Sequence, residues 1–338
     1  MSTLLDLGER EIIRRFLSPL VDGLGDDCAQ VQVDAGVAVL TTDPVPIPAA
    51  YVIGGDDDKY WVGWLLVVIN ASDLAASGCD PIGLLAAIEC PSDWSVRVFE
   101  RLVEGIRDAC LAHKIRYLGG NLKEAGIFSA TGTGIGLCVD RQPLSRSGAT
   151  SGDLIVLVGK PPAFWRDALA VRSGRQADRT GPLFRPIAQN EVMAALSRQS
   201  LVKASIDNSD GLLPSLQQLA VASSVSITLD LVQMRSGGAA ALGDSDPVRL
   251  MLGWGDWNMV CAIDPVNFER VKLVAKSNDS DCIVIGNADF GSQVYWGSGD
   301  HKTVVPRLES ERFAKDSWFS EGIDGYVSRL LTIPIPEA

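Results

Sequence analysis

The apolar residues of this 338-residue chain follow strand-like and helix-like spacing in turn. In the first part, a short amphipathic helix is expected at residues 7–17, and apolar residues recur every three or four positions over 59–77, which predicts a second helix. An N-cap at Ser92 or Asp93 begins another predicted helix, which runs to about His113. Alternating or continuous apolar runs predict strands at residues 37–40, 82–90, 115–118 and 131–139.

A segment of mostly small polar residues, 144–152, divides this pattern into two parts. We therefore expect an N-terminal domain at residues 1–148 and a C-terminal domain at 149–338, which are ordinary domain sizes. A buried strand at 153–159 begins the second part, and a further strand is expected near 226–231. The mixture of strands and helices in both parts predicts the α/β (α+β) class.

Acidic residues and glycines gather where the predicted strands end or the helices begin. The most crowded place is the segment 203–222, where a strand leads through Asp207, Ser209 and Asp210 into an apolar helix. Free amides at a helix start attract anions, and neighbouring carboxylates can hold a cation, so this turn could bind a phosphate together with its metal. Similar short segments contain Asp26 and Asp27, Thr42 and Asp43, Asp73, and Gly119 to Asn121.

These acidic turns have two explanations. If they converge, each pair of carboxylates at about 4 Å repels by roughly 4 kcal/mol at an effective dielectric constant near 20, and the cluster requires a cation. Oxygen ligands without nearby His or Cys suit Mg²⁺, and the expected chemistry is then phosphoryl transfer. Alternatively, Asp and Gly act here only as turn formers, and the turn at Asp207 is a helix N-cap with an Asx-turn.

The composition restricts the partners of the chain. Its formal net charge is -12 and it contains no Lys/Arg cluster, which argues against a nucleic acid or an anionic membrane. The most apolar run, 61–69, is shorter than the roughly 20 residues of a membrane span, and the N-terminus shows no signal peptide. The seven cysteines are scattered and are expected to be reduced, which favours a cytoplasmic protein.

Other kinds of active site have little support in the sequence. The chain has two histidines, and His113, at the end of a predicted helix, is expected to interact with the helix dipole or with solvent. A Ser-His-Asp or Cys-His site is therefore not expected. No GxxxxGK[ST] loop and no kinase HRD or DFG motif is present. Trp254 and Trp257, beside glycines and Asp256, are candidates for stacking on a ligand ring.

Six segments, taken in order, resemble one known family. They are GDDCAQV at 25–31, VLTTD at 39–43, VVINASDLAASGCDPIG at 67–83, YLGGN at 117–121, LSRSGATSGDLIVLVGK at 144–160 and SIDNSDGLL at 205–213. This series resembles the thiamine-monophosphate kinase family, which belongs to the wider aminoimidazole ribonucleotide synthetase-like superfamily. The resemblance extends over about residues 25–263.

The resemblance implies a fold, two cofactors and a set of site residues. The fold would be the two-domain synthetase-like fold, in which the N-terminal sheet contributes to a homodimeric barrel and ATP lies between the domains. With ATP and Mg²⁺ as cofactors, the implied metal ligands are Asp27, Thr42, Asp43, Asp73, Asp207 and Asp210. The implied nucleotide contacts are Gly119, Gly120, Asn121, Arg146 and Ser209. Among all of these, we expect the catalytic residues to be Asp73, Asp210 and Arg146.

Three places in the chain depart from the family pattern. The GGD of the family is Gly119-Gly120-Asn121 here, so an amide replaces one metal carboxylate. A substrate-binding histidine of the family has Ala50 near its expected place. The GGEDYE segment of the family reads GWGDWN at 253–258, which loses a Glu that contacts the thiamine moiety. The acceptor would therefore meet Ala50, Gly255, Asp256 and Trp257.

The sequence thus predicts an ATP- and Mg²⁺-dependent phosphotransferase, a homodimer that acts on a small-molecule acceptor, which can itself be phosphorylated, through an altered acceptor pocket. Three alternatives stay open. The first is a genuine thiamine-monophosphate kinase. The second is a synthetase or dehydratase that uses ATP to activate a carbonyl or amide oxygen. The third is a nucleotide-binding scaffold without catalysis.

Overall fold

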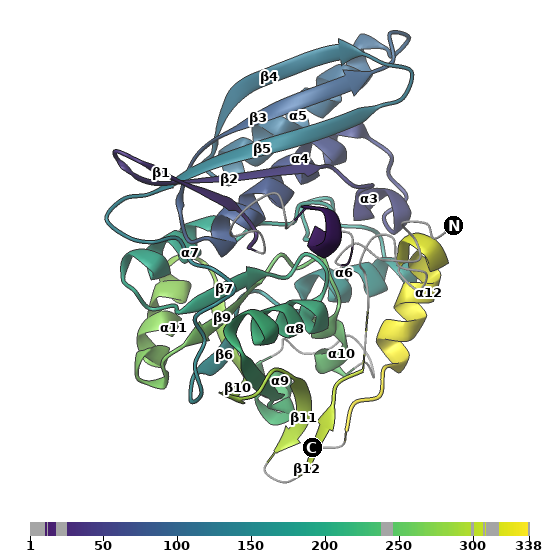
Figure 1. The fold of residues 1–338 in the computed structure, drawn as a ribbon. Coiled ribbons are helices and arrows are strands. Elements are labelled where there is room, and N and C mark those ends of the chain that lie inside the picture. Colours follow the sequence, from purple (N-terminus) through teal and green to yellow (C-terminus); the bar gives the residue numbers. More distant parts are fainter. Residues whose placement is uncertain are drawn as a thin grey trace.

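The structure is a computed structural model that describes residues 11, 13–17, 26–237, 246–298, 301–306, 308 and 318–336. Within these residues it contains two sheets, one from each half of the chain (Figure 1). The proposed domain boundary at residues 148–149 lies in the connection between them. Of the helix expected at 7–17, residues 7–10 and 12 lie outside the described residues, and its last part forms a π-helix at Ile13–Leu17.

The first sheet has five strands in the order β1-β2-β5-β3-β4. Their bounds are β1 Ala29–Val33, β2 Gly36–Pro44, β3 Asp80–Cys90, β4 Arg116–Glu124 and β5 Ser129–Cys138. The β3 and β4 strands pair in parallel because helix α5, Val96–Ala112, supplies the crossover between them. Helix α5 begins later than predicted, since its N-cap is Ser95, whose side chain accepts the amide hydrogen of Val98.

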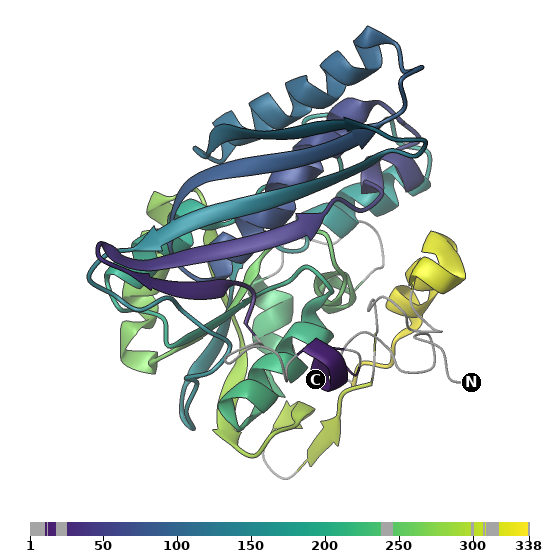
Figure 2. The ribbon, with the colours of Figure 1, turned by 45° about the horizontal axis from the view of Figure 1, so that its top comes forward.

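Helix α4, Lys59–Ala76, lies at the centre of the molecule, and its side chains are buried on nearly all sides. It packs against α5 and the first sheet, and also against α7 and β7 of the second half. A helix that is apolar all round is expected in such a fully enclosed position. Figure 2 shows α4 and α5 on the same face of the first sheet. The principal hydrophobic core therefore extends through α4 into both halves of the chain.

The second sheet has seven strands in the order β12-β11-β8-β10-β6-β9-β7. Their bounds are β6 Leu154–Gly159, β7 Ala204–Asp207, β8 Val225–Leu229, β9 Met259–Ile263, β10 Asp281–Phe290, β11 Val294–Ser298 and β12 His301–Val304. The remaining helices are α3 Ala49–Val52, α6 Ala163–Arg172, α7 Asn190–Arg198, α8 Leu212–Ser223, α9 Leu231–Gly237, α10 Pro247–Leu252, α11 Phe268–Ser277, α12 Trp318–Thr332 and a 3-10 helix at Pro265–Asn267. The mixed α/β architecture is the predicted one.

The cysteines and His113 are buried features of this fold. All seven cysteines are free thiols, and all except Cys90 and Cys282 are buried. His113 Nδ1 lies 2.8 Å from the Ala109 carbonyl oxygen, and its Nε2 accepts the Ala188 amide at 3.1 Å. His113 is buried and burial lowers its pKa, so the expected solvated role was wrong. It is the C-cap of α5, the helix end at which the alternative interaction with the helix dipole was expected. None of the described helices is long and apolar enough to cross a lipid bilayer.

Candidate active site

Three carboxylates from distant parts of the chain meet between the two sheets. Asp27 precedes β1, Asp73 lies near the end of α4, and Asp207 ends β7. One oxygen of each lies within 4.8 Å of the others, and we call these three residues the acidic cluster. The alternative of an Asp N-cap is wrong for α8, because its N-cap is Gly211, with φ 100° and no side-chain capping bond.

The acidic cluster is unfavourable when all three carboxylates are ionised. Burial raises the pKa of Asp73 well above its usual range, and the charges of Asp207, Asp43 and Asp27 raise it further. The pKa of Asp207 is raised to about 7, first by burial and then by the charge of Asp27. A divalent cation would offset both the loss of solvation and the repulsion between the carboxylates. Carboxylate oxygens are the donors that Mg²⁺ prefers. The residues present therefore fit the metal that the sequence implies.

Hydroxyl groups that sequence reasoning missed hold these carboxylates in place. Thr41 Oγ1 donates to Asp73 Oδ2 at 2.5 Å, and Ser72 Oγ donates to Asp207 Oδ2 at 2.8 Å. Thr41 could have been found, because it lies two residues before Asp43 on a strand and so shares its face. The reach of Ser72 from α4 to β7 depends on tertiary packing and leaves no signal in the sequence.

Arg146 lies at the edge of the acidic cluster and pairs with Asp27. Its Nη2 is 2.7 Å from Asp27 Oδ1, and its Nη1 donates to Gln218 Oε1 at 2.8 Å. Its backbone amide donates to Asp26 Oδ1 at 2.7 Å. The guanidinium thus neutralises part of the cluster's charge. Gln218, from helix α8, is a further residue that the sequence did not indicate.

Thr42 and Asn121 do not join the acidic cluster within one chain. Side chains alternate along β2, so Thr42 points away from α4 and its Oγ1 lies 3.1 Å from Thr133 Oγ1. Asn121 is paired with Ala87 on β3, and both β3 and β5 separate it from β2, a distance of roughly 14 Å at the usual strand spacing. By the register of the strands, it lies on the same outer face of the sheet as Thr42.

Gly119 and Gly120 lie inside β4, whereas the sequence predicted that the strand ends before them. Gly120 has φ 149°, and a Cβ there would lie 1.8 Å from the Ala86 carbonyl oxygen. A glycine is therefore required for the pairing of β4 with β3. This local packing explains Gly120 without a ligand, and the nucleotide contact of both glycines stays a prediction.

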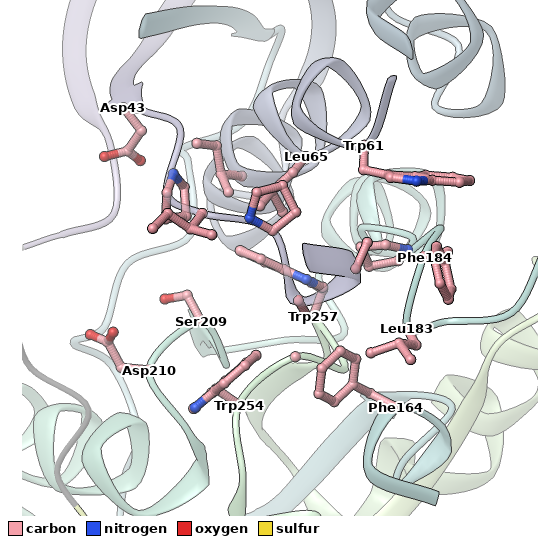
Figure 3. Close-up of a pocket in the computed structure, with 18 of the residues that line it drawn as sticks. Asp43, Trp61, Leu65, Phe164, Leu183, Phe184, Ser209, Asp210, Trp254 and Trp257 are labelled. Atoms are coloured by element: carbon pink, nitrogen blue, oxygen red, sulfur yellow. The ribbon is translucent and has the colours of Figure 1, made fainter. Parts of the chain in front are cut away.

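A cavity of about 340 Å³ opens beside the acidic cluster. Figure 3 shows its acidic residues gathered on one side and its aromatic rings on the other. The polar side contains Asp43, Asp73, Asp207, Ser209 and Asp210. The apolar side contains Ala50, Trp61, Leu65, Phe164, Leu183, Phe184, Trp254, Gly255 and Trp257. Three of the four predicted acceptor residues, Ala50, Gly255 and Trp257, therefore line one cavity with five of the predicted metal and nucleotide residues.

Asp256, the fourth predicted acceptor residue, faces away from this cavity. Its Oδ1 accepts the amide hydrogen of Phe164 at 2.7 Å, at the beginning of α6. Burial raises the pKa of Asp256 to about 7. In this position Asp256 fixes the start of α6 and with it the Phe164 ring, rather than touching a ligand in the cavity.

Comparison with known proteins identifies the family. The AIR synthase related protein, N-terminal domain, matches residues 25–138. A thiamine-monophosphate kinase of Halobacterium salinarum is 30% identical over 307 residues, 88% of this chain and 95% of that protein. One from Caulobacter vibrioides is 29% identical over 273 residues, 76% of this chain and 77% of that protein. The solved structure of AaThiL complexed with AMPPCP and TMP is 23% identical with a TM-score of 0.73, covering 91% of this chain and 98% of that one. The chain therefore belongs to the thiamine-monophosphate kinase family of ATP-dependent kinases.

Proposed function

We propose that this protein transfers the terminal phosphoryl group of ATP, with Mg²⁺, to a small molecule that binds in the cavity, and that its acceptor differs from thiamine monophosphate. The observation that carries the proposal is that Asp73 and Asp207 of the acidic cluster line one side of a cavity whose other side is apolar. Ala50 and Gly255, where the family has polar side chains, supply no hydrogen-bonding side chain to this cavity.

The proposed reaction assigns a task to each part of the site. Bound Mg²⁺ would neutralise phosphate oxygens and hold them in line for transfer. The acidic cluster would hold the metal, with Asp43 and Asp210 beside it, and Arg146 would turn from Asp27 toward a phosphate. The bond between the terminal phosphorus and its bridging oxygen breaks, and its electron pair leaves with ADP. An acceptor oxygen forms the new bond to phosphorus, and any proton that it carries passes to solvent.

A second candidate is thiamine-monophosphate kinase activity itself. The observation that favours it is the 30% identity over nearly the whole length of a protein with that name. The two candidates share the nucleotide and the metal and differ in the acceptor. They also differ from a synthetase that activates a carbonyl or amide oxygen, because that chemistry ends in release of inorganic phosphate rather than in a phosphorylated product.

The experiment is a measurement of ADP release with excess Mg²⁺ and a panel of acceptors, with products identified by mass spectrometry. We expect acceptor-dependent ADP release that excess chelator abolishes, and little thiamine diphosphate. Asp73→Asn and Asp210→Asn should lose at least 100-fold in rate, since each removes a charge from the site at nearly constant volume. The control is Asp289→Asn, in the exposed end of β10. Rapid formation of thiamine diphosphate would establish the second candidate, and full activity of both site variants would exclude phosphotransfer here.

A further inference from the structure

The residues that line the apolar side of the cavity determine which acceptor can bind there. We infer that the acceptor ends in a planar apolar ring, and that Phe164 is the residue that sets this specificity. This inference rests on the proposed function for the reacting end of the acceptor. It concerns the other end, where the chain departs from its family at Ala50 and Gly255.

The Phe164 ring occupies the space that a side chain at position 255 would need. Gly255 has φ 106°, and a Cβ built there would lie 2.6 Å from carbons of the Phe164 ring. Any side chain at this position would therefore clash and would also strain the backbone. The polar contact that the family makes from this position has been replaced by the face of an aromatic ring.

Phe164 is not free to move aside. Its side chain is 2% exposed, and its backbone amide donates to Asp256. Its ring centroid lies 5.3 Å from those of both Trp165 and Trp254, at tilted or edge-on angles. Aromatic neighbours in such arrangements stabilise one another beyond simple burial. The Phe164 ring is therefore held in place beside Gly255 and forms an apolar wall of the cavity. A polar side chain at position 255 could not take its space.

The other side chains on the apolar side of the cavity are largely hydrocarbon. Ala50 presents a methyl group, and the rings of Trp61 and Phe184, 4.9 Å apart, complete the wall near it. The indole nitrogens of Trp61 and Trp254 are buried within the wall. Among the described lining residues, the charged groups are confined to the acidic side. A strongly polar group on the remote end of the acceptor would therefore meet mostly carbon atoms, which disfavours binding.

Trp257 provides the surface on which a flat ring would lie. Figure 3 shows its indole in the middle of the lining, between the acidic side and Phe184. Its backbone has φ 52°, a left-handed conformation that a bulky residue rarely adopts. Such conformations persist where the surrounding structure holds them, and they gather at binding sites. The glycine before Asp256 and the tryptophan after it both line the apolar side of the cavity.

The test compares two phosphates that differ in the remote end. Binding of 2-naphthylmethyl phosphate and of thiamine monophosphate to the full chain is measured by calorimetry with Mg²⁺ and a non-hydrolysable ATP analogue. We expect the naphthyl compound to bind at least ten-fold more tightly. Phe164→Ala should reduce this preference by at least ten-fold, whereas Phe290→Ala, at an 86% exposed position, should leave it unchanged. If Phe164→Ala does not fold, Phe164→Leu keeps most of the volume and should show a smaller loss in the same direction.

Two outcomes would overturn the inference. One is that the wild type binds thiamine monophosphate as tightly as the naphthyl compound, or more tightly. The other is that the Phe164 variant loses the same factor of affinity for both ligands. Because these measurements involve no turnover, they separate the acceptor class from the reaction. Preferred binding of the naphthyl compound without any ADP release from ATP would keep the acceptor class and reject the proposed function. ADP release with thiamine monophosphate alone would reject the acceptor class and establish the second candidate function, thiamine-monophosphate kinase activity.

Discussion

At the scale of single residues, the candidate site contains carboxylates whose ionised forms are unfavourable without a cation. The pKa values of Asp73 and Asp207 are raised because both carboxylates are withdrawn from solvent and lie beside other carboxylates. Their hydrogen bonds with Thr41 and Ser72 fix the oxygens but do not remove the repulsion. A protein that keeps such a cluster gives up stability in the absence of a cation, which leads to a prediction about metal removal.

Asp73→Asn should separate the loss of stability that the acidic cluster causes from its binding of Mg²⁺. Without metal, we expect the variant to melt about 2–4 °C above the wild type at pH 8, because one buried charge is gone at constant volume. Millimolar Mg²⁺ should raise the melting temperature of the wild type and leave that of the variant nearly unchanged. Thermal unfolding followed by circular dichroism measures both. A wild type that responds to Mg²⁺ no more than the variant does would contradict a metal site here.

Asp256 predicts a pH dependence of stability that is independent of the metal. Its pKa is about 7 in the folded chain and lower when unfolded, because burial favours the neutral acid. The folded state therefore binds the proton more strongly, and this contribution to stability is complete at low pH and is lost as the pH rises through 7. Asp256→Asn cannot ionise but retains an oxygen for the Phe164 amide.

The free energy of unfolding of the wild type, relative to that of Asp256→Asn, should therefore fall by on the order of 2 kcal/mol between pH 5 and pH 8. Urea unfolding at several pH values in saturating Mg²⁺ measures this difference while the metal keeps the acidic cluster ionised. Parallel curves for the two proteins would show that Asp256 does not titrate in this range.

At the scale of elements, spacing along the chain predicted the helices and strands but not the faces that they present to one another. The acids were found because each lies at a boundary of an apolar run: Asp27 comes before one, and Asp73 and Asp207 come after one. Asn121 was grouped with them because its strand was expected to end early. In the structure β4 continues to Glu124, and the residue lies on the outer face of the sheet. Strand register is set by pairing partners, which a single sequence does not contain.

The close contact between α4 and α5 also could not be predicted from the sequence. A Cβ at Gly63 would lie 2.1 Å from the Leu102 carbonyl oxygen, and one at Gly105 would lie 2.0 Å from that of Tyr60. The two helices therefore touch backbone to backbone, and α4 carries Asp73 at its far end.

Gly105→Ala should force these helices apart. We expect a loss of about 1–3 kcal/mol in the free energy of unfolding, since overpacking outweighs the better helix propensity of alanine. Denaturant unfolding of the variant measures it. The matched control is Gly126→Ala, where a Cβ would meet no atom within 4 Å. Equal stability of both variants would mean that the close approach is not needed.

At the scale of the whole molecule, the first sheet has one covered face and one open face. Helices α4 and α5 lie on the covered face (Figure 2). On the open face, Val31 and Ala38 are paired across β1 and β2, and Ala38 is paired with Leu137 on β5, which makes an apolar row. Val31 is 50% exposed in the single chain. Thr42 and Asn121, two predicted site residues that stand apart from the acidic cluster, lie on this same face.

We propose that two copies of the chain pair through the open face of the first sheet, as the family resemblance implies. Pairing would cover the apolar row and would bury Thr42 and Asn121, so that their predicted contact with a nucleotide could arise only in the pair. Light scattering at micromolar concentration should give twice the 36.1 kDa mass of the chain. Val31→Lys should give the single mass, because a pair would place two like charges in an apolar interface. Leu111→Lys, at a 71% exposed position on α5, should remain paired. A wild type of single mass, or equal behaviour of the two variants, would reject this face as the interface and leave Asn121 as a surface residue of β4 without a part in the site.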